Sequence, residues 1–124
     1  MKYSAHSQYA GEIKYIEMSD EKYKRIISSS ESVDIPEHMA EAFAVWCDYF
    51  GKDYTEYVYA MLFIDQYQGE YDDIDDFCEH AFSYMWEQDQ CEYDLPDDGK
   101  TAYLADAYNN GYHMLCGHYA FCTL

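Results

Sequence analysis

The feature that most constrains this chain is a stretch of 47 residues, from 53 to 99, that contains 15 Asp and Glu residues and no Lys or Arg. Like charges at this density repel one another and destabilise a compact state. A charge block of this kind is usually a solvated face or a disordered tail. Large apolar residues run through the stretch, among them Met61, Phe77 and Trp86, so it has material for a core. We therefore expect it to fold and to carry its carboxylates outside.

The rest of the chain is much closer to neutral. Residues 1–52 hold six basic and nine acidic residues, and residues 100–124 hold one of each, so 53–99 contributes most of the net charge of −18. This imbalance disfavours binding to nucleic acid or anionic lipid and favours a basic protein partner. The opening residues have no apolar signal-peptide core, and no apolar run reaches the length of a bilayer span. We therefore expect a cytoplasmic protein.

Hydrophobic periodicity predicts an α+β fold that is dominated by helices. Residues 2–18 are expected to form a small β element that turns near Ala10 and Gly11, and the last residues a β-hairpin that turns at Gly117 and His118. A short helix capped by Ser19 and a serine-rich linker over 28–32 follow the first element. We divide the chain into a small β/α unit, 1–32, and a helical unit with the terminal hairpin, 33–124.

Three further helices are predicted from acidic pairs at capping-box spacing. The pairs are Asp34 with Glu37, Asp53 with Glu56, and Asp73 with Asp76. Gly51 and Gly69 are expected to end the first two helices as left-handed caps. The expected buried faces are Met39, Phe43, Trp46, Cys47 and Phe50 in the first; Tyr57, Met61, Ile64 and Gln68 in the second; and Ile74, Phe77, Cys78, Ala81 and Met85 in the third.

Metal binding and catalysis are weakly indicated. The acids after Gly69 do not follow the spacing of an EF-hand loop, which excludes that type of calcium site. A cluster of soft ligands near the C-terminus leaves a small metal-binding protein as an alternative; its members are His113, Cys116, His118 and Cys122. Cys116 with His113 or His118 makes a Cys/His pair without an evident orienting group, so we expect no enzyme. The absence of an export pattern argues that the five cysteines are reduced.

The carboxylates themselves are the strongest functional signal. Duplex DNA carries one charge per about 1.7 Å of axis, and neighbouring positions on a helix face, about 5–6 Å apart, can place carboxylates at a comparable spacing. The chain is more acidic than solubility requires, because a net charge of about 2–8 suffices for a small domain. We therefore expect a surface that imitates DNA. Its candidate residues are Asp53, Glu56, Asp65, Glu70, Asp72, Asp73, Asp75, Asp76, Glu79, Glu87, Asp89, Glu92, Asp94, Asp97 and Asp98.

The central part of the chain resembles the ArdA antirestriction family. The likeness is strongest over residues 41–82, which read EAFAVWCDYFGKDYTEYVYAMLFIDQYQGEYDDIDDFCEHAF, and extends over 38–124. The family motif Y-x-G-E-Y-x-S-x-x-D-F-A is matched by Tyr67, Gly69, Glu70, Tyr71, Asp76 and Phe77. Its A-[YF]-A-R-D-L segment and aromatic hairpin are matched by Ala102, Tyr103, Asp106 and Tyr112. Asp73 stands in place of the motif serine and Ala105 in place of the arginine.

This resemblance implies a phage or mobile-element protein that acts in the cytoplasm of a bacterial host cell and is shortened relative to the family's three small domains. Such proteins are acidic, elongated and often dimeric. They occupy the DNA-binding groove of type I restriction–modification enzymes without catalysis or a cofactor. Two other readings stay open: a DNA mimic directed at a CRISPR effector, and an acidic adaptor for one basic protein. Aromatic residues of the terminal hairpin, expected to be exposed, are candidates for a homodimer contact: Tyr112, Tyr119 and Phe121.

Overall fold

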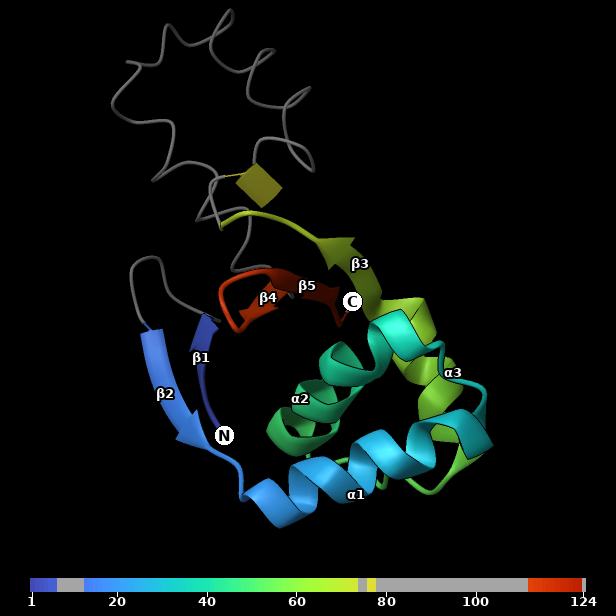
Figure 1. The fold of residues 1–124 in the computed structure, drawn as a ribbon. Helices are drawn as coiled ribbons and strands as arrows, with labels where there is room; N and C mark the ends of the chain where they lie inside the picture. Colours follow the sequence, from blue (N-terminus) through green and yellow to red (C-terminus); the bar gives the residue numbers. More distant parts are fainter. Residues whose placement is uncertain (7–12, 74–75, 78–111, 124) are drawn as a thin grey trace, which may run out of the picture.

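The fold is α+β, as the sequence predicts, and is seen in a computed structural model that describes residues 1–6, 13–73, 76–77 and 112–123. These residues form three α-helices and one five-stranded antiparallel sheet with the strand order β2-β1-β4-β5-β3. The sheet bends around one side of the central helix α2, and α1 and α3 lie on its other sides (Figure 1). No helix among the described residues is long and apolar enough to cross a bilayer.

The predicted N-terminal β element is a hairpin of β1 (Lys2–His6) and β2 (Ile13–Glu17). β1 is an inner strand, with Tyr3 and Ala5 buried, and β2 is an edge strand whose side chains are mostly exposed. The ammonium group of Met1 donates to the carbonyl oxygen of Met18 at 2.7 Å, which fixes the start of β1 beside the end of β2. β1 also pairs with β4, so strands from both predicted units belong to one sheet.

Helix α1 (Asp20–Ser30) begins as predicted, because the Ser19 side chain accepts a hydrogen bond from the Lys22 amide at 3.2 Å. The predicted serine-rich linker is wrong. Ser29 and Ser30 complete the last turn of α1, and a short 3-10 helix follows at Glu31–Val33. The hydroxyl of Ser30 donates to the Ile27 carbonyl at 2.8 Å, so this serine is held by the helix itself.

Helix α2 (Ala40–Phe50) carries the predicted apolar face and lies between α1, α3 and β4. It ends at Gly51, whose φ of 65° makes the predicted left-handed cap. The predicted capping box of Asp34 with Glu37 does not form. Asp34 instead has a left-handed conformation after the 3-10 helix, and a second 3-10 turn, Glu37–Met39, precedes α2.

Helix α3 (Tyr57–Gln66) runs directly into strand β3 (Tyr67–Glu70). Asp53 forms no capping box, because its carboxylate accepts from the amide and hydroxyl of Thr55 in the preceding turn. The predicted buried face is also wrong: Ala60 and Phe63 face the core, whereas the members of the predicted face that lie in α3 are exposed. Gly69 does not end this helix and lies at an irregular point of β3, with φ of 110°.

The C-terminal hairpin consists of β4 (Tyr112–Leu115) and β5 (Tyr119–Cys122), with β3 paired on the far side of β5. Its turn lies one residue earlier than predicted, because Cys116 and Gly117 both have positive φ, and the His118 amide bonds to the Leu115 carbonyl at 3.2 Å. The Cys116 amide donates to the Ser4 carbonyl at 2.8 Å, so the turn is attached to β1.

An aromatic cluster connects helices α2 and α3 to the sheet. The ring centre of Phe63 lies 5.3 Å from that of Phe43, 5.7 Å from that of Trp46 and 5.9 Å from that of Phe121. The indole N–H of Trp46 donates to Oε1 of Gln66 at 3.0 Å, which satisfies the polar edge of this buried ring. Phe63 therefore stands where α2, α3 and the sheet meet.

Candidate functional site

The acidic corner is the segment from Glu70 to Phe77, where the chain leaves β3. The Tyr71 amide donates to the His118 carbonyl at 2.8 Å, which ties the segment to the terminal hairpin. Asp73 accepts from the Asp76 amide at 2.7 Å, and the Phe77 amide bonds to the Asp73 carbonyl at 3.1 Å. The predicted acidic cap at Asp73 is thus confirmed at the start of a helical turn, whereas the rest of the predicted third helix, with Ile74, Cys78, Ala81 and Met85, lies outside the described residues. Backbone hydrogen bonds and this cap therefore define the path of the chain through the corner.

Phe77 anchors the corner to the rest of the protein. Its side chain is 1% exposed and lies between the rings of Tyr71 and Tyr112, with centre-to-centre distances of 5.0 and 5.7 Å. Tyr112 belongs to β4, so Phe77 connects the corner to the sheet. The prediction that Phe77 is buried is confirmed.

Seven of the fifteen candidate acids lie in the part of the chain that the structure describes. They are Asp53, Glu56, Asp65, Glu70, Asp72, Asp73 and Asp76. All are exposed except Asp76, which is half-buried. The other eight lie outside the described residues: Asp75, Glu79, Glu87, Asp89, Glu92, Asp94, Asp97 and Asp98. The expected helical series from Asp72 to Glu79 therefore falls partly outside this region.

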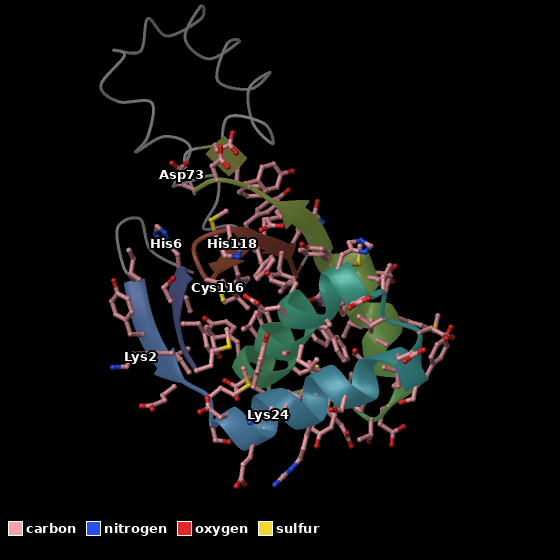
Figure 2. All side chains as sticks on the ribbon, in the orientation of Figure 1. Lys2, His6, Lys24, Asp73, Cys116 and His118 are labelled. Atoms are coloured by element: carbon pink, nitrogen blue, oxygen red, sulfur yellow. The ribbon has the colours of Figure 1, made fainter. Side chains whose placement is uncertain are left out.

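These exposed acids are not paired with the described Lys and Arg residues, and Lys52, which directly precedes Asp53, lies over the ring of Tyr59. No described Lys or Arg forms an ion pair with Asp65, Asp72 or Asp73, and the ion pairs of Lys22 and Arg25 go to acids of the first 52 residues. Lys2 and Lys24 lie toward one end of the protein and Asp73 at the other (Figure 2). Lys2 and Lys24 are therefore set apart from the corner that carries Asp73 (Figure 2).

Two of the exposed acids have a defined local environment. Nε2 of His118 lies 3.8 Å from Oε1 of Glu70, which makes an ion pair when this imidazole is protonated. The hydrogen bonds from Thr55 hold the pKa of Asp53 below its ordinary value, so this carboxyl stays ionised. Asp53 therefore has a structural partner, whereas Asp65 and Asp72 have no hydrogen bond or ion pair from their side chains to any described residue.

A polar network that the sequence does not predict connects β1, α1 and α2. The carboxylate of Asp48 accepts from Nζ of Lys22 and from the Tyr3 hydroxyl, both at 2.6 Å. A nearby hollow of about 490 Å³ is lined by Tyr3, Glu41 and Cys116, among others. The helical periodicity of α1 and α2 predicts which side of each helix Lys22 and Asp48 occupy. It does not predict that these two helices pack against each other, so it does not predict the pair.

Burial shifts the pKa values of two groups that line this hollow, Tyr3 and Cys116, and that of Tyr119. Burial is the main cause that raises the pKa of Tyr3 and that of Tyr119, and it raises the pKa of the Cys116 thiol to about 12. A thiol with such a pKa stays protonated near pH 7 and is a poor nucleophile. The network supplies packing and charge neutralisation rather than an activated group.

The candidate metal ligands of the C-terminus do not converge. Within the described part of the chain, which includes His113, Cys116, His118 and Cys122, no three His, Cys, Asp or Glu side chains are placed to hold a metal ion. His113 packs its ring edge-on against Phe50 at 5.2 Å between centres. The zinc-type spacing in the sequence is therefore spread over two strands and a turn.

The expected exposed aromatics of the hairpin are also corrected. Tyr119 is 8% exposed, Phe121 is fully buried in the aromatic cluster, and Tyr112 is half-buried against Phe77. β5 is an inner strand between β4 and β3, so its side chains serve the core. Tyr119 and Phe121 thus offer little surface to a second copy of the chain.

Comparisons with protein-family models, curated proteins and solved structures found no match to this chain.

Proposed function

We propose that this chain is a non-catalytic acidic inhibitor that imitates duplex DNA and occupies the DNA-binding groove of a bacterial defence enzyme. The first target to consider is a type I restriction–modification complex. The observation that carries the proposal is the set of exposed carboxylates from Asp53 to Asp73, which no described Lys or Arg neutralises. The resemblance of residues 41–82 to the antirestriction family points the same way.

The arrangement of the acids supports a binding role. Repulsion among unpaired carboxylates destabilises the folded state, so a stretch of chain with this many exposed acids and no Lys or Arg needs a reason other than stability. Glu70, Asp72 and Asp73 stand on a corner that is tied to β4 and β5, which limits the loss of conformational freedom on binding. A basic groove built for phosphates would bind such a corner by charge and shape, independently of the DNA sequence that the target recognises.

The mechanism is electrostatic competition. The inhibitor and DNA would bind the same Lys and Arg residues of the groove, so each would displace the other. Complementary charge would speed association at low salt, and screening would weaken the complex as salt rises. The proposal assigns no reacting group and no cofactor to this chain.

The test is competition for a purified type I restriction–modification complex, measured as displacement of labelled duplex DNA at low and at high salt. The acidic triple variant Asp65→Asn, Glu70→Gln, Asp72→Asn removes three charges from acids outside the capping hydrogen bonds. We expect it to displace DNA about tenfold less well or worse, because three charges that attract the basic groove are removed. A tenfold loss corresponds to about 1.4 kcal/mol of binding free energy. Its dependence on salt should also be shallower than that of the parent.

A matched control removes the same number of charges from exposed acids in the first 52 residues: Glu17→Gln, Glu31→Gln, Glu37→Gln. We expect this control to compete as well as the parent. Equal loss in both variants would show that net charge alone matters, and no loss in the acidic triple variant would place the binding surface elsewhere. If the chain binds the target without displacing DNA, it is an adaptor rather than a mimic.

A further inference from the structure

One side of α3 is an exposed apolar face, formed by Tyr57, Val58, Met61 and Ile64. The exposed fractions of these side chains are 55%, 62%, 55% and 46%, respectively. Their spacing of one, three and three residues places them together on one side of the helix. Four large apolar side chains on one helix face form a patch of the kind that marks an interaction site.

The opposite side of α3 is already packed. Ala60 and Phe63 are buried against the core, so the helix is apolar on both sides. A helix that is apolar all round is ordinarily buried all round. The packed side accounts for the stability of α3 in this fold, and the exposed side does not contribute to it. The exposed face is therefore available for a contact with another molecule.

The face has a shape that can receive a side chain. A small hollow of about 60 Å³ lies between α3 and the segment before α2, and its lining includes Val33, Ile35, Met61 and Ile64. Val33 and Ile35 are buried and form its floor. The hollow therefore gives the apolar face a point of shape complementarity.

Carboxylates surround the face. Asp34 lines the hollow, Glu56 directly precedes α3, and Asp65 follows Ile64 on the same side of the helix. All three are exposed, and α3 itself contains no Lys or Arg. The neighbouring cation, Lys52, lies over the ring of Tyr59 at 5.6 Å. The rim of the apolar face is thus acidic.

We propose that the α3 face is a docking surface for a partner protein that presents apolar side chains surrounded by Lys and Arg. The charges select this occupant over a second copy of the chain, because pairing two copies through α3 would bring the acids Asp34, Glu56 and Asp65 of one copy close to those of the other. An amphipathic basic helix is the simplest partner that matches both the apolar centre and the acidic rim.

This contact shares the carboxylates of Glu56 and Asp65 with the proposed DNA-imitating surface, but it goes beyond that surface because its centre is apolar. DNA offers no apolar surface comparable to α3, so a partner bound here would be a protein. Salt screens the charges of the rim, but it does not weaken burial of the apolar face. A complex that uses α3 would therefore keep part of its affinity at high salt.

The test uses two designed helical peptides of equal length and charge, one of Leu and Lys and one with Ser in place of each Leu. Binding to the full chain is measured by calorimetry at low and high salt. We expect the parent to bind the Leu/Lys peptide at least about tenfold more tightly. The variant Val58→Gln, Met61→Gln should bring this ratio close to one without changing affinity for the Ser/Lys peptide.

The matched control is Ile13→Gln, Tyr15→Gln, which removes exposed apolar side chains from the edge strand β2. This control should keep the preference of the parent. The proposal is overturned if the parent does not prefer the Leu/Lys peptide, or if the β2 control loses the preference equally. It is also overturned if sedimentation shows that the parent is a dimer and the α3 variant a monomer, because a second copy would then cover α3. Unfolding of that variant at a clearly lower urea concentration than the parent would overturn it too, because the chain itself would then cover α3.

Discussion

The carboxylate of Asp73 accepts a hydrogen bond from the backbone N–H of Asp76 at 2.7 Å, and the carboxylate of Asp76 accepts one from the backbone N–H of Asp72 at 3.0 Å. Two acids of the corner therefore satisfy backbone donors at the start of a helical turn. Glu70 and Asp72 lie beside them, but their carboxylates accept no backbone hydrogen bond from the described residues. Asp73 and Asp76, which stabilise the backbone of the corner, thus follow along the chain two acids that accept no such hydrogen bond.

The variants Asp73→Ala and Asp72→Ala should separate these two roles. Loss of the Asp73 cap should lower the free energy of unfolding by about 1 kcal/mol, whereas Asp73→Asn, which keeps an acceptor oxygen, should cost much less. Asp72→Ala should change stability by less than about 0.5 kcal/mol, because its side chain is exposed. Urea denaturation of the three variants measures these differences. Equal costs for Asp72→Ala and Asp73→Ala would contradict the assignment of the cap.

Two neighbouring residues test which face of α3 is buried. Phe63→Ala should lower the free energy of unfolding by about 3–5 kcal/mol, because it leaves a cavity where α2, α3 and the sheet meet. Ile64→Ala should cost less than about 1 kcal/mol, because Ile64 is almost half exposed. Chemical denaturation of both variants gives the comparison. Similar costs would show that Ile64 is packed as Phe63 is.

The network around Asp48 should be important for stability. Asp48→Ala removes the acceptor of both Lys22 and the largely buried Tyr3 hydroxyl, and should cost about 1–3 kcal/mol. Lys22→Ala should cost less, because the lysine side chain is 43% exposed and Asp48 keeps its bond from Tyr3. Thermal and urea unfolding measure both. A larger cost for Lys22→Ala than for Asp48→Ala would contradict this account.

Burial lowers the pKa of His113, and this shift predicts a dependence of stability on pH. Between the lowered pKa of the folded state and the ordinary value of about 6.5, the unfolded chain binds more protons at this site than the folded chain. The contribution of His113 to stability is therefore complete above about pH 6.5 and falls as pH drops below it.

The variant His113→Phe isolates this effect, because the other groups titrate in both proteins. The free energy of unfolding of the parent should fall relative to that of the variant between about pH 7 and about pH 5. The phenyl ring would keep the edge-on contact with Phe50. Among the described residues, Nδ1 of His113 has no hydrogen-bond partner that the change would remove. A constant difference across this range would show that His113 does not change its charge on unfolding.

The start of α1, the end of α2 and the acidic cap could be predicted from the sequence because each has a local cause. Ser19 and Gly51 act on the backbone within a few residues, and the acidic pair at Asp73 does the same. The Ser28–Ser32 segment misleads because its composition favours a loop, whereas serine hydroxyls can also bond to the preceding helical turn, as Ser30 does.

The buried face of α3 could not be predicted because both of its faces are apolar. Periodicity finds a stripe, but it does not choose between Ala60 with Phe63 and Met61 with Ile64 when each pair fits. Nor does periodicity show that β5 lies between two other strands, which is why Tyr119 and Phe121 were expected at the surface. Long-range neighbours decide these cases. The same limit applies to the Lys22–Asp48 pair, whose members are 26 residues apart.

The separation of Lys2 and Lys24 from Asp73 gives the described part of the protein an electric moment as well as a net charge (Figure 2). Lys2 and Lys24 lie toward one end and Asp73 lies at the other (Figure 2). In the field of a basic surface such a body experiences a torque as well as an attraction. It would turn during its approach, so that the corner at Asp73 leads and the lysine-bearing hairpin and helix trail. Productive encounters would then be a larger fraction of all collisions than for a uniformly charged protein of the same total charge.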